Sequence, residues 1–264
     1  MNLHSEITSW WNTHPCELWH SNKSHNTIDF SHEISKHRQT HKFDVLNFFD
    51  LEKLKHQLVL EVGCGIGTDG LRFSQLGTNY VGVDISSKSI EIAQQRFLIE
   101  NAKGQFYVRD ASKSGVLTDL GKFDIVFSWG VIHHWPSPED FLPNFYQALN
   151  PTGKLILSVY NEYSWKNALV KQNLAQYEAA DSVPYVRCFS EEQIRNMLRP
   201  YFEIELIDCV GLMKYNIEKY KKGIFEVEPW FSVMPNSLLQ AIEKRLGEFM
   251  VIVATPKSKD HNDE

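Results

Sequence analysis

Short apolar runs alternate with helix-like segments from about residue 58 onward, and this alternation constrains the fold more than any other feature. The runs are rich in β-branched residues and lie at Leu58–Val62, Tyr80–Val83, Gln105–Arg109, Asp124–Ser128 and Lys154–Tyr160. Phe202–Val210 and Phe249–Thr255 are predicted to be the last two strands. Short, nearly continuous apolar strands are typical of a parallel sheet covered on both faces. The alternation therefore predicts an α/β fold on a largely parallel sheet.

The segments between the strands carry recognisable helix starts. Ser86 is placed to cap one helix, and Ser190-Glu191-Glu192-Gln193 reads as a capping box for another. Ser137-Pro138 opens a third helix. Pro143 lies inside that third helix, where we expect it to remove one backbone hydrogen bond and bend the helix.

Two regions fall outside the alternation and suggest additions to one main domain. We expect residues 1–50 to form an N-terminal helical arm or lid, and residues 51–255 to form the ligand-binding domain. Within that domain, 161–200 and 211–247 are expected to be cap-like insertions, and 256–264 a disordered tail. The chain length of 264 residues is cramped for two full domains.

Composition excludes several classes of partner. The net charge of -6 argues against a broad nucleic-acid surface, because phosphate binding relies on clustered Lys and Arg. The four cysteines are scattered, and the N-terminal histidines match no ordered ligand spacing, so no metal site is expected. The chain shows no signal-peptide pattern and no apolar stretch long enough to span a membrane. These features favour a cytoplasmic protein with a small-molecule partner.

A glycine-rich loop, Leu60-Glu61-Val62-Gly63-Cys64-Gly65-Ile66-Gly67, follows the first strand and precedes a helix. Gly63 and Gly65 allow a tight turn, and Gly67 allows the helix to pack close to the ligand. In that context the loop indicates a nucleotide site. A dinucleotide loop would carry glycine at position 68, where this chain has Thr68. A glycine-rich turn without a ligand is the alternative interpretation.

Acidic residues at three successive strands sharpen this interpretation. Asp84 ends the second strand, where its carboxylate can accept hydrogen bonds from both hydroxyls of a ribose. Asp110 ends the third strand, within reach of the exocyclic amine of an adenine. Glu61 lies inside the first strand, where a charge is costly unless it meets polar backbone or a cationic ligand.

These motifs, together with Phe123–His134 and Leu149–Gly153, resemble the successive motifs of class I S-adenosylmethionine-dependent methyltransferases. The resemblance covers roughly residues 57–160 and is greatest to the C-methyltransferases of ubiquinone and menaquinone biosynthesis. It implies a Rossmann-like, mostly parallel sheet of seven strands with an antiparallel last strand and helices on both faces. It also implies that S-adenosylmethionine binds over the carboxyl edge of that sheet and leaves as S-adenosylhomocysteine.

The resemblance also implies a set of cofactor-binding residues. The amino-acid moiety would contact the glycine loop, the ribose the acid of the second strand, and the methionine part the end of the fourth strand. The predicted residues are Glu61, Gly63, Cys64, Gly65, Gly67, Asp84, Ile85, Asp110, Ala111, Ser128, Trp129 and Gly130. Cys64 is interpreted as a packing residue and not as a nucleophile.

The adjacent pair His133 and His134 follows the fourth strand and supplies the candidate catalytic residues. Methyl transfer is an in-line displacement, so a base is needed only where the acceptor must lose a proton. Either histidine could serve, because imidazole titrates near neutral pH. Alternatively, both only shape the wall of the acceptor site.

Aromatic residues are the remaining candidates for an acceptor site. Trp10, Trp11 and Trp19 either anchor the N-terminal arm or form an aromatic lid over an apolar or cationic acceptor. Tyr160 and Trp165 are candidates for the acceptor wall.

The sequence thus favours a small-molecule methyltransferase. An NAD(P)-dependent oxidoreductase on a related sheet and a catalytically inactive methyltransferase-fold regulatory or partner protein are the alternatives.

Overall fold

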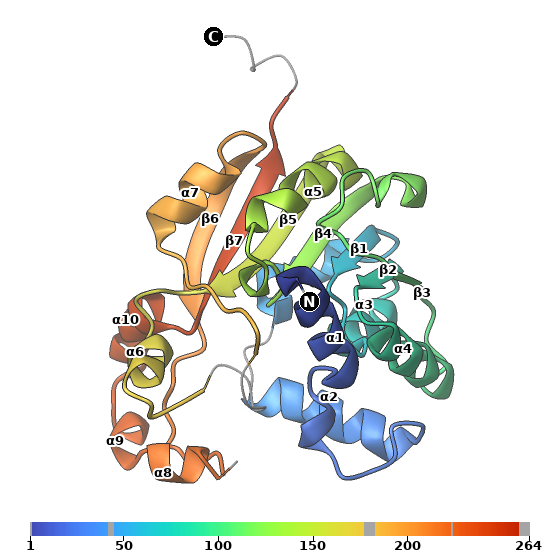
Figure 1. Ribbon diagram of the computed structural model, residues 1–264. Helices are drawn as coiled ribbons and strands as arrows, with labels where there is room; N and C mark the ends of the chain where they lie inside the picture. The colour runs from blue at the N-terminus through green and yellow to red at the C-terminus, as the bar shows by residue number, and fades with distance from the viewer. Residues whose placement is uncertain (1, 42–44, 177–182, 223, 259–264) are drawn as a thin grey trace.

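A seven-stranded sheet runs through the protein in the order β3-β2-β1-β4-β5-β7-β6 (Figure 1). The computed structural model describes residues 2–41, 45–176, 183–222 and 224–258. The strands are β1 Leu58–Val62, β2 Asn79–Asp84, β3 Gln105–Val108, β4 Phe123–Trp129, β5 Leu149–Tyr160, β6 Phe202–Val210 and β7 Phe249–Pro256. β1 to β5 pair in parallel, whereas β7 runs antiparallel to both β5 and β6. The predicted sheet with an antiparallel last strand is confirmed.

Helices cover both faces of the sheet, as predicted. The helices are α1 Leu3–Thr13, α2 Ile28–His41, α3 Thr68–Gln75, α4 Ser87–Ile99, α5 Leu142–Ala148, α6 Trp165–Lys171, α7 Glu191–Leu198, α8 Ile217–Tyr220, α9 Pro229–Ser232 and α10 Asn236–Leu246. α5 and α7 contribute to one large apolar cluster together with Leu60 and Val62 of β1. α3 and α4 contribute to the second cluster, which contains Val59. Successive side chains of β1 therefore enter opposite cores.

The predicted caps agree with the structure, whereas the predicted loss of a hydrogen bond at Pro143 does not. The side chain of Ser86 caps α4, and the capping box of Ser190 and Gln193 starts α7. The helix expected at Ser137 begins as a short 3-10 segment, Pro138–Phe141, and α5 follows it. Pro143 therefore sits in the first turn of α5, where backbone N–H groups have no intrahelical partner. The expected loss of a hydrogen bond is wrong, because the N–H that proline lacks would have no intrahelical partner there.

The N-terminal arm packs beside the carboxyl ends of the strands (Figure 1). Asn12, next to the end of α1, accepts a hydrogen bond through its side-chain oxygen from the backbone N–H of Lys88, at 3.1 Å. The same oxygen accepts from the hydroxyls of Ser86 and Ser87. These contacts fasten α1 to the start of α4. α2 packs against α3 and α4.

Of the two regions expected to be insertions, 161–200 contains α6 and α7, and 211–247 contains α8, α9 and α10 (Figure 1). Residues 177–182 of the first region lie outside the described residues, as do residues 259–264 of the expected tail.

The chain order of the strands creates the position for a ligand. From β1 the chain proceeds outward through β2 and β3, and it then returns to place β4 on the other side of β1. In open α/β sheets, a crevice forms at the carboxyl ends of the strands where this reversal occurs.

Candidate functional site

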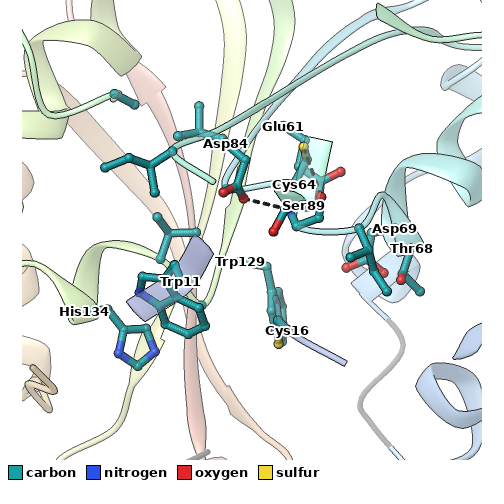
Figure 2. Close-up of a pocket in the computed structure, with 18 of the residues that line it drawn as sticks. Trp11, Cys16, Glu61, Cys64, Thr68, Asp69, Asp84, Ser89, Trp129 and His134 are labelled. Carbon is teal, nitrogen blue, oxygen red and sulfur yellow. Dashed lines mark hydrogen bonds between the residues drawn. The ribbon is translucent and has the colours of Figure 1, made fainter. Parts of the chain in front are cut away.

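A pocket lies at this reversal point, over the carboxyl ends of β1 and β4 (Figure 2). Its lining comes from the loop after β1, the ends of β2 to β5, the start of β7 and the N-terminal arm. Because the lining follows the order of the strands, acids from β2 and β3 gather at one end. Aromatic side chains from β4, β5 and β7 gather at the other end.

The glycine loop forms the floor between these two ends. Gly63 and Gly65 have φ of 76° and 51°, in the left-handed region that favours glycine. A Cβ added at Gly63 would lie 2.1 Å from Val131 Cγ2, so a side chain is excluded there. A Cβ added at Gly65 would meet no atom within 4 Å. Gly65 therefore leaves its backbone open to close approach by a ligand.

Asp84 connects the end of β2 to this loop. Its Oδ2 accepts a hydrogen bond from the backbone N–H of Gly65, and its Oδ1 accepts one from the backbone N–H of Ser86, each at 2.8 Å. Burial raises the pKa of Asp84, while these two hydrogen bonds oppose the rise. Each carboxylate oxygen has capacity for a further hydrogen bond. Asp84 can thus hold the loop and also accept hydrogen bonds from ligand hydroxyls.

The outer part of the acidic end contains Asp110 and Ala111, with Ile85 nearby in the lining. Asp110 Oδ1 accepts hydrogen bonds from the backbone N–H and the hydroxyl of Ser112, at 3.2 and 2.6 Å. The side chain of Asp110 is therefore fixed by hydrogen bonds within the turn that contains it. The side chains of Ile85 and Ala111 add apolar surface beside this carboxylate, against which a planar nucleobase can pack.

Glu61 is a buried acid in the lining of the pocket. Its Oε2 accepts a hydrogen bond of 2.5 Å from the hydroxyl of Tyr80. Burial, together with the negative charge of Asp69, raises the pKa of Glu61 well above its ordinary value. A cationic group in the pocket would favour the ionised form of Glu61.

The predicted cofactor residues divide into two groups. Those that line the pocket are Glu61, Gly63, Cys64, Gly65, Asp84, Ile85, Asp110, Ala111, Trp129 and Gly130. Gly67 and Ser128 lie outside the lining. A Cβ at Gly67 would press on Ala93 at 3.2 Å, and Ser128 is fully buried and donates a hydrogen bond to the carbonyl of Val62. Burial raises the pKa of the Cys64 thiol well above its ordinary value, in keeping with a packing residue.

Rings from distant parts of the chain form a continuous wall at the other end of the pocket, which we call the aromatic end. Ring centroids lie 5.3 Å apart for Trp129 and Phe249, and 5.2 Å apart for Phe249 and Tyr160. Tyr160 approaches His134 at 5.9 Å, and His134 approaches Trp11 of α1 at 5.0 Å (Figure 2). All five side chains line the pocket.

The other aromatic candidates lie elsewhere. Trp10 stacks on His14 and meets the edge of Trp11, Trp19 is partly exposed beside His20, and Trp165 stacks on Trp230. None of these three tryptophans belongs to the lining formed by the described residues.

The two candidate catalytic histidines have different surroundings. His134 lines the pocket, and its Nδ1 lies 3.0 Å from the carbonyl oxygen of Tyr185. A carbonyl can only accept, so Nδ1 carries the proton and Nε2 is the basic nitrogen. His133 is fully buried, and its Nδ1 accepts a hydrogen bond from the backbone N–H of Tyr160. Burial, together with His134, lowers the pKa of His133 well below its ordinary value.

Several polar residues of the lining were missed by the sequence analysis. Arg38 of α2 forms a bidentate ion pair with Asp69 of α3, with Nε–Oδ1 and Nη2–Oδ2 distances of 3.2 and 2.5 Å. Glu17 accepts a hydrogen bond of 2.6 Å from the hydroxyl of Thr68. These contacts join the N-terminal arm to the helix that follows the glycine loop. Asp69 could have been predicted to lie near the pocket, because it comes two residues after Gly67. No feature of the sequence predicts the same for Arg38.

The described part of the chain contains neither a cluster of metal ligands nor a membrane-spanning helix. No group of three or more His, Cys, Asp or Glu side chains there is arranged to hold a metal ion. None of the helices in those residues is long and apolar enough to cross a membrane.

The sequence is similar to that of known methyltransferases. A family model described as a methyltransferase domain matches residues 34–201. A tRNA U34 carboxymethyltransferase from Cellvibrio japonicus is 36% identical over 111 residues, covering 40% of this chain and 34% of that protein. A ubiquinone biosynthesis O-methyltransferase from Haemophilus ducreyi is 33% identical, covering 39% of this chain and 45% of that protein. The chain thus spans less than half the length of either relative.

The fold is shared with solved structures at low sequence identity. The magnesium protoporphyrin IX methyltransferase from Synechocystis PCC 6803, crystallised with bound SAM, aligns with a TM-score of 0.60. Its sequence is 17% identical, and the alignment covers 97% of this chain and 98% of that chain.

Proposed function

The chain belongs to the family of proteins that carry this methyltransferase domain, and on that premise we propose that it binds S-adenosylmethionine and methylates a small-molecule acceptor. The pocket over the carboxyl ends of β1 and β4 is the observation that carries the proposal. It combines an open glycine backbone, acids from successive strands and a separate aromatic end.

The residues of the pocket fit the parts of this cofactor. Asp84 has hydrogen-bonding capacity for the ribose hydroxyls, and Asp110 with Ile85 and Ala111 suits an adenine. Gly63, Gly65 and Glu61 lie where the amino-acid part would follow, toward Trp129 and Gly130. The acidic lining also favours a ligand with positive charge on its sulfur and ammonium groups.

When bound, S-adenosylmethionine supplies a methyl group on a positively charged sulfur. The protein's own contribution is to hold the acceptor in line and to exclude water. The rings of Trp11, Trp129 and Tyr160 can bury a flat acceptor, and α1 contributes Ile7 as well as Trp11 to the lining. His134, which lines the pocket, can take up the proton of a hydroxyl or amine acceptor. His133 would then support Tyr160 from behind the wall.

The charge of the pocket supports a small molecule over RNA as the acceptor. The two arginines of the lining are already paired, Arg38 with Asp69 and Arg109 with Asp119. The protein carries a net charge of -6, which disfavours a long contact with phosphates. None of the four cysteines, all within the described residues, forms a disulfide, which agrees with the cytoplasm as the proposed location.

Methyl transfer from labelled S-adenosylmethionine tests the proposal directly. The purified protein is incubated with a small-metabolite extract and, in parallel, with bulk tRNA. We expect label in the small-molecule fraction and none after the Asp84→Ala substitution. Label confined to tRNA would refute the proposed acceptor class. Transfer to neither fraction would favour a catalytically inactive protein.

A further inference from the structure

The second cap-like region, residues 211–247, presents large apolar side chains to solvent. Val233 is 83% exposed, Ile224 52% and Trp230 44%. Trp230 and Val233 lie three residues apart across the single turn of α9, and this spacing places two residues on one side of a helix. Apolar side chains that gather on a surface mark a contact with a partner more often than scattered ones do.

Backbone hydrogen bonds join α8 and α9 into one compact element (Figure 1). The N–H of Glu228, directly before α9, donates to the carbonyl of Lys214 at 2.9 Å, and an isolated antiparallel bridge adds to this pairing. Ile224 follows α8 and donates to the carbonyl of Lys219 at 3.0 Å. We call this element the cap tip, residues 214–222 and 224–233. It lies at one edge of the molecule, away from the sheet (Figure 1).

The inner side of α9 fixes the exposed side in place. Phe231 is buried, and its ring centroid lies 3.7 Å from that of Trp230. Trp230 also stacks on Trp165 of α6, at 5.9 Å. The exposed part of Trp230 and the neighbouring Val233 are therefore presented on a packed helix. Such a surface needs little ordering when it meets a partner.

The cap region is basic, although the whole chain is acidic. Residues 211–247 contain six basic and four acidic side chains, a net charge of +2 in a chain of -6. The acids are engaged within the protein: two pair with lysines, one accepts from Asn216, and one accepts from the backbone of Gly211 and Leu212. Four basic residues form no ion pair with any described residue: Lys214, Lys222, Lys244 and Arg245.

Apolar side chains flanked by unpaired cations fit the surface of an anionic membrane. Each lysine near such a surface raises the affinity by about fivefold through attraction to the headgroups. Trp and aliphatic side chains enter the boundary between headgroups and acyl chains. An RNA would use the same lysines, but it would leave Val233 without an apolar partner. The exposed apolar residues therefore favour lipid.

We infer that the cap tip docks the protein on the surface of an anionic membrane, with Trp230 and Val233 entering the headgroup boundary. Lys214 and Lys222 bind the lipid phosphates. Docking of this kind lies in the plane of the interface and needs no helix that crosses the bilayer. It is independent of the proposed methyl transfer, because none of these residues lines the pocket.

Flotation of the full chain with lipid vesicles tests the apolar part of the contact. The vesicles contain phosphatidylcholine alone, or phosphatidylcholine with about one third phosphatidylglycerol, and we expect at least about tenfold tighter binding to the second kind. Val233→Asp should weaken that binding by about tenfold or more, because a carboxylate replaces a side chain that enters lipid. Leu98→Asp is the matched control. Leu98 is 81% exposed on α4, outside the cap tip, and its variant should bind as the native protein does.

A second pair of variants tests the charges. Lys214→Ala combined with Lys222→Ala should lower the affinity for the anionic vesicles by about tenfold or more, to near that for neutral ones. Lys55→Ala combined with Lys103→Ala removes two exposed lysines outside the cap region and should have little effect.

Three results would overturn the inference: no binding to the anionic vesicles, equal losses in Val233→Asp and Leu98→Asp, or equal losses in the two double lysine variants. Bulk tRNA provides the remaining comparison. If the protein binds tRNA through Lys214 and Lys222 with no loss in Val233→Asp, and binds vesicles more weakly, the cap tip is a nucleic-acid contact instead. Affinity for S-adenosylhomocysteine should be native in every variant, so a failure of docking is distinguishable from a failure of the proposed function.

Discussion

The two ends of the pocket are built in different ways. The acidic end consists of Asp84, Asp110 and the glycine loop, which lie at the end of a strand or within two residues after it and are held by hydrogen bonds to their near neighbours. The aromatic end combines Trp11, Trp129, Tyr160 and Phe249, which are spread over nearly the whole chain. The first end depends on local turns and the second on tertiary packing. We therefore expect substitutions at the two ends to affect different steps, cofactor binding at one and use of the acceptor at the other.

The largest effect is expected at His134, at the aromatic end. If His134 takes up the acceptor's proton, His134→Ala should lower kcat by about 100- to 10,000-fold, the usual contribution of a general base. Affinity for S-adenosylhomocysteine should stay close to that of the native protein. The measurement is kcat with the acceptor found by the labelling experiment, together with isothermal titration. Activity within about threefold of native would reduce His134 to a wall residue.

Asp84 should give the corresponding result at the acidic end. Asp84→Ala removes the acceptor for the ribose hydroxyls and releases the N–H of Gly65, so affinity for S-adenosylhomocysteine should fall about 100-fold. Asp84→Asn is the matched control. Asparagine keeps the shape of the aspartate side chain but not its charge. The affinity of Asp84→Asn for S-adenosylhomocysteine should therefore lie between those of the native protein and Asp84→Ala. Unchanged affinity in Asp84→Ala would show that the ribose lies elsewhere.

Trp11 tests whether α1 contributes to the acceptor site. Trp11→Ala removes one ring of the wall and should raise the KM for an aromatic acceptor by about tenfold, as expected for the loss of a buried aromatic contact. Trp10→Ala is the control, because Trp10 packs beside Trp11 without lining the pocket. Similar changes in KM for both variants would mean that α1 is an anchor and not a wall.

The smallest effect concerns His133, behind the aromatic end. Its folded-state pKa lies below the ordinary value, so between the two values the unfolded chain binds a proton that the folded chain does not. Stability is therefore lost as the pH falls below about 6.5, by up to about 1.4 kcal/mol per pH unit from this group.

Urea unfolding across this pH range measures that loss. His133→Asn can still accept the N–H of Tyr160 but cannot titrate, so the free energy of unfolding should fall less steeply than in the native protein. Equal slopes for the two proteins would show that His133 titrates normally in the folded state.

The contrast between the two ends also explains what could be predicted from the sequence. The bounds of β1 and β6, the Ser86 cap and the capping box at Ser190 were predicted correctly, because each depends on a few adjacent residues. Most of the predicted cofactor residues line the pocket for the same reason. Gly67 and Ser128 belong to the same motifs, but they face the protein interior instead of the pocket.

The residues that escaped prediction depend on long-range contacts. Arg38 and Glu17 reach the pocket because the N-terminal arm packs on α3 and α4, and no local pattern encodes that packing. Likewise, the continuity from Trp11 through His134 to Tyr160 arises only in the folded chain.

Thermal unfolding with S-adenosylmethionine, S-adenosylhomocysteine and NAD in parallel tests the central claim most directly. Both sulfur ligands, at about 100 times their dissociation constants, should stabilise the protein by about 2.7 kcal/mol and raise the midpoint by roughly 5 °C or more. NAD at the same concentration should leave the midpoint unchanged. A rise with NAD alone would contradict the account, because it would make the pocket a dinucleotide site.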